Sequence, residues 1–319
     1  MDTKFIVSSS PHVKMKDRIS SIMLNVIIAL IPAMIAGVYY FGLSALLVIL
    51  TSVASCVLSE YVYECITKKT KTVKDLSAVV TGVLLALTLP PKTPLWMVVI
   101  GGAFAIIIVK QLYGGLGKNF MNPALAARCF MIAAWAGVMT TYTTPMTDAV
   151  TSATPLGILK GTSEGMLPGM LDALLGNKAG CIGETSGIAL IIGFLYLLFT
   201  KVIDWKIPVS YIGSFAILMY LFGTNQTGES QMYFTVMHVL TGGLLLGAFF
   251  MATDYVTTPN TGLGMIIFGI GCGILTYVIR VFGGYPEGVS FAILLMNIAT
   301  PIIERFTIPR AFGEVKKNG

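Results

Sequence analysis

The sequence predicts an all-α polytopic membrane protein with about ten transmembrane helices. Of its 319 residues, 55% are hydrophobic and only 11% are charged, whereas a soluble domain carries about 25% charged residues. Long apolar runs recur along the whole chain, and a membrane-spanning helix needs about 20 such residues. Lysine and arginine gather at the ends of these runs, where they set orientation, so the net charge of +6 does not indicate nucleic-acid binding.

Apolar segments follow one another from the N-terminus to the C-terminus. We expect helices near 21–41, 43–63, 75–90, 95–110, 120–138, 182–200, 207–223, 234–252, 262–282 and 288–304. Several segments are short and end in Pro, Gly or Thr close to bilayer depth, as in "LTLPPKTP" and "MATDYVTTP". Irregular backbone at that depth is tolerated only where protein encloses it, which predicts broken helices around an internal site.

Basic residues predict the orientation of the chain. The N-terminal arm (1–20), the 65–74 loop and the last residues (305–319) each hold four of them, and Lys110 with Lys118 and Lys201 with Lys206 add two pairs. With ten spans these segments all lie on one side, which the positive-inside rule makes cytoplasmic. We therefore expect a bacterial cell-membrane protein with both termini inside and the 139–181 loop outside.

An internal repeat divides the membrane part. "LSAVVTGVLLALTLPPKTP" is similar to "TVMHVLTGGLLLGAFFMATDYVTTP", and each continues through an apolar helix into a Gly-Gly turn, "YGGLGKNF" or "FGGYPEGV". This predicts two pseudo-symmetric repeats, 21–138 and 182–305, followed by a cytoplasmic tail, 306–319, with a site between the halves. Chance similarity of Gly-rich membrane helices is the alternative.

Charged residues inside spans are costly and usually functional. Arg128, Glu184, Asp254 and Arg280 are such residues, although a structural ion pair explains each one about as well. Arg280 lies close enough to a helix end for its side chain to reach the interface. The five cysteines are scattered without a CxxC pair, so we expect no metal centre held by this chain.

The stretch "DAVTSATPL" lies in the longest polar break of the chain. Its plain interpretation is a turn whose hydroxyls cap a short helix. It also resembles the D-x-x-[ST]-G-A-T motif at which a flavin transferase attaches FMN to the last threonine as a phosphoester. The matching residues are Asp148, Thr151, Ser152, Ala153 and Thr154, with Ser152 in place of the usual glycine. This resemblance implies covalent FMN on Thr154.

Further motifs carry a family resemblance. "SSSPHVK", "GGLGKNFMNPALAARCF", "MATDYVTTPNTGLG" and "GGYPEGVSFAILLMNIATPIIER" occur in the order seen in the D-subunit of the Rnf complex, whose relative is the B-subunit of the sodium-pumping NADH:quinone oxidoreductase. The resemblance implies a urea-transporter-like fold, a second, noncovalent flavin (riboflavin), and an ion-translocating ferredoxin:NAD⁺ oxidoreductase. Asn122 and Asp254 lie at the two breaks and are our candidates for the riboflavin surroundings.

The same resemblance implies partners. The chain would work with the other Rnf subunits, one of which also carries a flavin, in membrane lipid, and would be inactive alone. No side chain is expected to be catalytic, because the flavins supply the redox chemistry. The moved cation, Na⁺ or H⁺, stays open. A secondary transporter or channel for a small polar solute is the alternative, and a structural membrane anchor is another. Neither explains Asp148 and Thr154.

Overall fold

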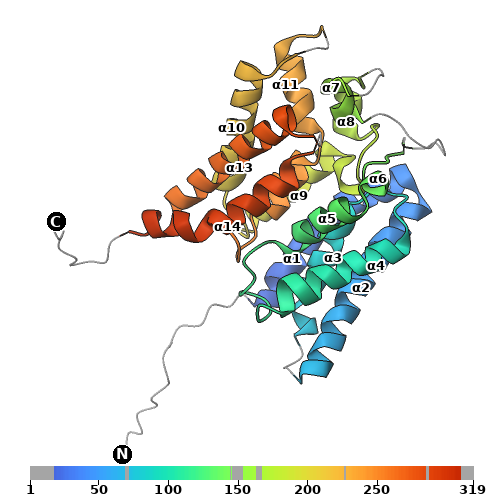
Figure 1. Cartoon of the computed structure of the whole chain (residues 1–319), viewed down its shortest axis with the longest axis vertical. Coiled ribbons are helices and arrows are strands. Elements are labelled where there is room, and N and C mark those ends of the chain that lie inside the picture. Colours follow the sequence, from blue (N-terminus) through green and yellow to red (C-terminus); the bar gives the residue numbers. More distant parts are fainter. Residues whose placement is uncertain are drawn as a thin grey trace, which may run out of the picture.

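Helices form the regular structure of this protein, seen here in a computed structural model (Figure 1). The structure describes residues 18–68, 72–143, 145, 154–162, 167–225, 228–284 and 287–309. The first elements are α1 (Ile19–Phe41), α2 (Leu43–Thr67), the 3₁₀ turn η1 (Val73–Asp75), α3 (Ser77–Leu87), α4 (Leu95–Ala103), the π-helical η2 (Phe104–Gln111), α5 (Pro123–Ala134) and α6 (Ala136–Met139). The later elements are α7 (Pro155–Leu159), α8 (Met170–Leu175), the 3₁₀ turn η3 (Ile182–Glu184), α9 (Gly187–Phe199), α10 (Lys206–Phe222), α11 (Gln231–Leu240), α12 (Leu244–Leu246), the π-helical η4 (Gly247–Met251), α13 (Gly262–Phe282) and α14 (Val289–Thr307).

Helix α2 organises the first half of the chain by packing on both α3 and α4. Ser52 Oγ donates to Gly82 O at 2.7 Å, and Ser55 Oγ donates to Val99 O at 2.8 Å. A Cβ added at Gly82 would lie 2.7 Å from Val53 Cα, so the two helices approach through a glycine. Lipid is as apolar as leucine, so the hydrophobic effect does not drive helices together inside a membrane. Small residues and hydroxyls hold the helices together instead, through close packing and hydrogen bonds.

Helices α10 and α13 form the matching close pair of the second half. A Cβ at Gly269 would lie 1.9 Å from Ser210 Oγ, and a Cβ at Gly273 would lie 2.0 Å from Ser214 Oγ. Glycines four residues apart lie on one face of a helix and admit a neighbouring backbone. Helix α14 also packs on α13, so α10, α13 and α14 form one layer of helices.

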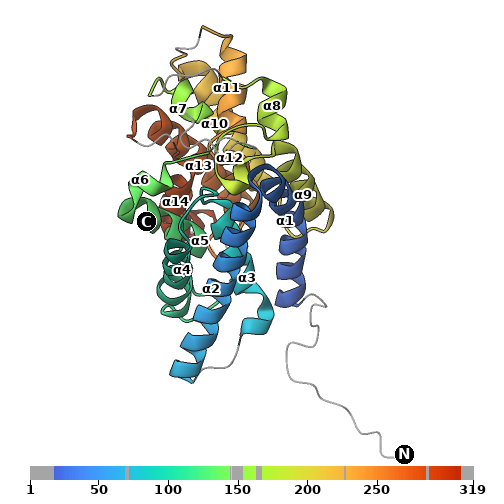
Figure 2. The same ribbon diagram turned by 90° about the vertical axis from the view of Figure 1, so that its right-hand side faces the viewer.

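The two halves lie side by side, with α9 next to α1 (Figure 2) and α5 in contact with α14. Gly193 on α9 permits the first contact, because a Cβ there would lie 2.1 Å from Ala29 O on α1. Tyr196 on α9 donates its hydroxyl to Asn25 Oδ1 on α1 at 3.1 Å. Each contact joins one helix of the first predicted repeat to the corresponding helix of the second.

The membrane-protein prediction is confirmed, whereas the number of spans stays a prediction. By length and composition, four helices in the described part of the chain can cross a membrane: α1, α2, α13 and α14. A fifth span results if α11 and the α12–η4 segment, bent by 59° to each other, count together. All ten expected segments contain helix, but several are short. At 1.5 Å per residue, α3 is only about 17 Å long, roughly half the hydrocarbon thickness.

Both expected breaks interrupt helices. Helix α3 ends at Leu87 and α4 begins at Leu95, and inside this break Leu89 O accepts a hydrogen bond from Ile182 N at 3.1 Å. The second expected break, "MATDYVTTP", separates η4, which ends at Met251, from α13, which begins at Gly262. The structure also interrupts the helix expected over 234–252: between α11 and α12 the chain turns through Gly242 and Gly243 (φ +73° and +67°), left-handed conformations that favour glycine. A break frees backbone groups that need partners when buried. Those partners form much of the candidate site.

Candidate functional site

Thr154 begins the short helix α7. Its backbone is extended (φ −68°, ψ 147°), Pro155 occupies the first helical position, and Thr154 Oγ1 accepts a hydrogen bond from Gly157 N at 3.1 Å. The hydroxyl thus caps the helix, as the plain interpretation of the motif predicts. An accepting hydroxyl keeps its proton and a second lone pair, which leaves it chemically competent. The other motif residues, Asp148, Thr151, Ser152 and Ala153, lie outside the described residues.

Helix α7 rests on the break between α11 and α12. Leu156 is buried, and a Cβ added at Gly242 would lie 2.7 Å from Leu156 Cδ2. Lys160, just after α7, donates from Nζ to Gly283 O at the end of α13. These contacts anchor the residues that follow Thr154, so a group attached to Thr154 would be tethered beside the break.

Arg280 satisfies the carbonyl groups that the break frees at the end of α11. Its Nη1 donates to His238 O at 2.5 Å, and its Nη2 donates to Thr241 O and Gly242 O at 3.0 Å each. Arg280 is 2% exposed, so its side chain points into the protein and does not reach the membrane interface. A cation at this position also complements the negative end of the α11 helix dipole.

Two further charged side chains bind backbone groups at the break. Lys178 Nζ donates to Leu240 O, and the Glu184 carboxylate accepts from Gly242 N. Glu184 therefore faces the positive N-terminal end of α12, while Lys178 faces the negative end of α11. Burial lowers the pKa of Lys178 to about 8, against a smaller opposing effect of Glu184.

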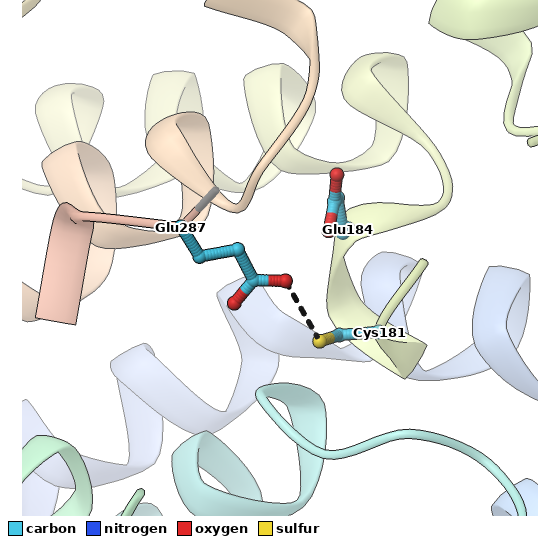
Figure 3. Close-up of side chains that lie close together, drawn as sticks. All are labelled: Cys181, Glu184 and Glu287. Carbon is cyan, nitrogen blue, oxygen red and sulfur yellow. Dashed lines mark hydrogen bonds between the residues drawn. The ribbon is translucent and has the colours of Figure 1, made fainter. Parts of the chain in front are cut away.

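A second group of polar side chains joins the two halves of the chain. Arg128 on α5 donates from Nη2 to the carboxylate of Glu287, which precedes α14. Tyr142 donates its hydroxyl to Glu287 Oε1 at 2.6 Å. Cys181 Sγ lies 3.9 Å from Glu287 Oε1 (Figure 3). The same sulfur lies 3.4 Å from Arg128 Nη2. The expected intramembrane charge Arg128 is therefore half of an ion pair between segments far apart in sequence.

Cys181, Glu184 and Glu287 resemble a metal site in spacing alone. One ligand atom of each lies within 4.8 Å of the others, and Figure 3 shows Glu287 approaching Cys181 and Glu184, which share one segment. Arg128 already binds Glu287, however, and Arg280 and Lys178 bind the same break as Glu184. A metal ion would add positive charge where basic side chains already compensate both carboxylates. The arrangement suits negative charge better than a metal ion.

Asn122 and Asp254, the two candidates for the riboflavin surroundings, both line one cavity. Asn122 caps α5, since its Oδ1 accepts from Ala124 N at 3.0 Å. Asp254 Oδ2 accepts from Thr257 Oγ1 at 3.3 Å. The cavity holds about 760 Å³ of space, part of it open to solvent, and Thr154 does not line it. Its other walls are mainly apolar: Ile22, Met23, Val26, Val80, Leu84, Leu116, Leu197, Val202, Ile203, Phe250 and Val256.

A buried ion pair forms one polar wall of this cavity. Lys110 Nζ lies 2.6 Å from Glu60 Oε1 and donates to Ser77 Oγ at 2.6 Å. Lys110 and Ser77 both line the cavity, as does Asn119. Two acceptor atoms in this region, Glu60 Oε2 and Asn119 Oδ1, are buried without a hydrogen-bond partner. Of these two residues Asn119 lines the cavity, so its Oδ1 is an acceptor that a bound molecule could use.

The sequence alone does not single out four charged residues of these sites as intramembrane candidates. Lys110 counts as a loop cation in the orientation argument, yet the apolar run "AIIIVK" before it is a signal of burial. Glu60 ends the apolar run "SCVLSE", which is a similar signal. Lys178 and Glu287 lie in polar, Gly-containing turns, where a charge is ordinary, so the sequence holds no signal for them.

Comparison with known proteins agrees with the resemblance. The chain is 52% identical to the D-subunit of the Na⁺-translocating ferredoxin:NAD⁺ oxidoreductase complex of Acetobacterium woodii, over 97% of this chain and 96% of that protein. It is 47% identical to the D-subunit of the proton-translocating complex of Clostridium ljungdahlii, over 97% and 96%, and 38% identical to the D-subunit of an ion-translocating oxidoreductase complex of Stutzerimonas stutzeri, over 93% of both. A sequence model of the NQR2, RnfD, RnfE family matches residues 6–313. The chain therefore belongs to the NQR2, RnfD, RnfE family.

Proposed function

We propose that this chain is the flavin-carrying membrane subunit of an ion-translocating ferredoxin:NAD⁺ oxidoreductase of the Rnf type. Relatives that match nearly its whole length bear the name of the D-subunit of such complexes. The observation that supports a redox role within the complex is the presence of two separate candidate flavin sites, at Thr154 and at the cavity of Asn122 and Asp254. Electrons enter and leave through other subunits, so the chain is inactive alone.

At the first site FMN is joined to Thr154 as a phosphoester by a flavin transferase. The described residues fit this role, because Thr154 is half-buried, its backbone is fixed by α7, and α7 is anchored on the α11–α12 break. Esterified Thr154 is an anchor: it keeps the flavin from diffusing away while the ring meets a flavin on a partner protein of the complex. Asp148, Thr151, Ser152 and Ala153 are proposed as the recognition sequence of the transferase.

At the second site riboflavin binds noncovalently in the cavity of Asn122 and Asp254. The cavity is mostly apolar with a few polar groups, which suits a flat ring with polar edges. Asn119 Oδ1, buried without a partner, can accept the ring N–H of a flavin. Bound flavin supplies reversible one- and two-electron chemistry, and the chain supplies position, dryness and charge.

The membrane arrangement belongs to the same proposal. Ten spans in two pseudo-symmetric, urea-transporter-like repeats would place both termini in the cytoplasm and Thr154 outside. Support comes from the contacts of α1 with α9 and of α5 with α14, which pair corresponding helices. In this arrangement the two flavins bind at different depths of one bundle, and electron transfer between them is coupled to movement of Na⁺ or H⁺. Relatives named for each cation leave that choice open.

A test uses the chain co-expressed with a flavin transferase. Denatured wild-type protein is expected to fluoresce in a gel and to carry the mass of one FMN phosphoester. Thr154→Ala should lose both signals, whereas Thr162→Ala, a matched loss of a hydroxyl beyond α7, should keep both. Wild-type protein without flavin, beside a transferase shown to be active on another substrate, would refute this site. The solute-transporter alternative would then be favoured.

A further inference from the structure

Five buried or half-buried charges form one network around the α11–α12 break. Arg128 and Glu287 pair across the two halves, while Lys178, Glu184 and Arg280 bind the backbone of the break. Glu184 and Glu287 lie within ligand-sharing distance of each other and of Cys181, which makes the two groups one cluster (Figure 3). We call these five side chains the break network.

The break network carries an excess of positive charge. Its three cations face two carboxylates, and among the described residues nearby Lys160 adds another cation at the surface of the network. Net charge buried in protein is costly, so the excess calls for a compensating negative charge. Ion pairing within the network therefore leaves one positive charge without a partner carboxylate.

Unused donors indicate where the negative charge would act. Arg128 Nη1 and Arg280 Nε are buried without a hydrogen-bond partner, and both side chains are at most 3% exposed. Arg128, Glu184 and Glu287 line a cavity of about 20 Å³ between the two halves, which has room for about one water-sized group. A ring as large as isoalloxazine would therefore act on the network from outside this cavity, through its charge.

The flavin proposed on Thr154 is tethered at the edge of this network. Leu156, two residues after Thr154, lies close to Gly242, which itself accepts from Arg280. Lys160 fixes the end of α7 to Gly283, four residues before Glu287. Charges buried in a low-dielectric interior act over longer distances than exposed ones, since salt and water screen them less.

We propose that the break network stabilises the negative charge of the reduced FMN on Thr154 and thereby raises its midpoint potential. This inference rests on the function proposed above. Reduction by two electrons from the electron-donating partner subunits, with one proton taken from water, leaves one negative charge on the ring. That charge balances the excess positive charge of the network. The five residues act as positioning and tuning groups and exchange neither electrons nor atoms with the flavin.

The test is a spectroelectrochemical titration of the purified, flavinylated full-length chain. The spectrum of the covalent FMN is obtained as the difference from Thr154→Ala protein. Lys178→Met removes a positive charge and should lower the midpoint potential, whereas Glu287→Gln removes a negative charge and should raise it. Each shift is expected to correspond to about a tenfold change in the reduction equilibrium, or about 30 mV for a two-electron couple.

The matched control is Lys206→Met, which removes a lysine charge at the start of α10, beside the end of α13 that is far from Arg280. Gly262 lies beside Lys206, and Arg280 is about 27 Å further along that helix at 1.5 Å per residue. The control should leave the potential unchanged. If Lys178→Met does not fold, Lys178→Gln keeps a polar donor and tests the same charge.

The outcomes separate the two proposals. Opposite shifts in the Lys178 and Glu287 variants, with none in the control, support the tuning role. Unchanged potentials, or shifts of one sign in both variants, would overturn it while gel fluorescence still shows FMN on Thr154. Absence of covalent flavin from the wild-type chain would overturn the flavin function itself.

Discussion

Removal of Lys110 should strongly destabilise the protein, because it leaves a buried carboxylate without its cation. Lys110 Nζ lies 2.6 Å from Glu60 Oε1, and the two side chains are 2% and 0% exposed. With an effective dielectric constant of about 20, charges at that distance attract each other by about 6 kcal/mol before desolvation is considered. Breaking a buried pair by deleting one partner costs about 3–5 kcal/mol. We expect Lys110→Met to lie in that range.

A doubly substituted protein tests whether the loss comes from the unpaired Glu60 carboxylate. Replacing both charges, as in Lys110→Met with Glu60→Gln, removes the unpaired carboxylate, and replacement of a whole buried pair is often neutral or stabilising. Glu60→Gln keeps an oxygen that can accept from Gln111 Nε2, now 2.8 Å from Glu60 Oε1. We therefore expect the double variant to recover at least about 2 kcal/mol of the loss, a coupling within the range seen for contacting residues.

Equilibrium unfolding of the wild type, both single variants and the double variant in mixed detergent micelles gives the complete double-mutant cycle. Lys206→Met is the control, because its partner Asp204 is one-third exposed and surface pairs contribute about 0–1 kcal/mol. A loss below about 1 kcal/mol in Lys110→Met, or the absence of coupling to Glu60, would refute the reasoning that this pair is buried and mutually dependent.

Three other predictions concern packing, flavin retention and pH. Gly193→Ala places a Cβ 2.1 Å from Ala29 O and should lower the free energy of unfolding in micelles by about 1–3 kcal/mol. The control Gly213→Ala meets open space and should not lower it. Equal effects of the two variants would contradict the α1–α9 contact. Asn119→Leu should weaken riboflavin binding by up to about tenfold and lower the acid-extractable riboflavin without loss of gel fluorescence, since one hydrogen bond is worth about 1.4 kcal/mol or less. Full retention would exclude that contact. Because the pKa of Lys178 is about 8, this side chain loses its charge as the pH rises through that value. The midpoint potential of the covalent FMN should therefore fall between about pH 7 and pH 9 more steeply than in Lys178→Met protein, and parallel curves would contradict the assignment.

The helices can be predicted from the sequence because apolar length and Gly-Pro punctuation are local properties. The segments 262–282 and 288–304 correspond to α13 (Gly262–Phe282) and α14 (Val289–Thr307) almost residue by residue. The break after "VMHVLTGG" is a correction, because one helix is expected from the sequence over 234–252; the two glycines at positive φ that follow α11 are the local signal for it. Helix lengths are predicted less well: 75–90 is helical only over Ser77–Leu87, because the Pro-rich segment that follows leaves the helix.

The candidate cavity can be predicted in part. Asn122 and Asp254 are candidates because each lies at a break of its own repeat, and breaks that face each other across a pseudo-symmetric bundle converge. Lys110 and Glu60 escape prediction, because their pairing depends on how η2 packs against α2, two elements whose contact no sequence pattern specifies. The position of a charge on a helix can be predicted from sequence, but its partner requires the packing.

The break network is the clearest case in which the sequence does not predict which charged residues come together. Arg128 and Arg280 are recognisable singly as costly intramembrane charges, and a simple ion pair would explain each of them. Lys178 and Glu287 come from turns in which a charged residue needs no explanation. Only the fold gathers these residues, with Glu184, around one pair of freed helix ends and leaves three cations against two carboxylates. The excess charge belongs to the assembled set and to none of its members. A potential measured on the flavin of Thr154 is therefore the direct test of whether that set has a function.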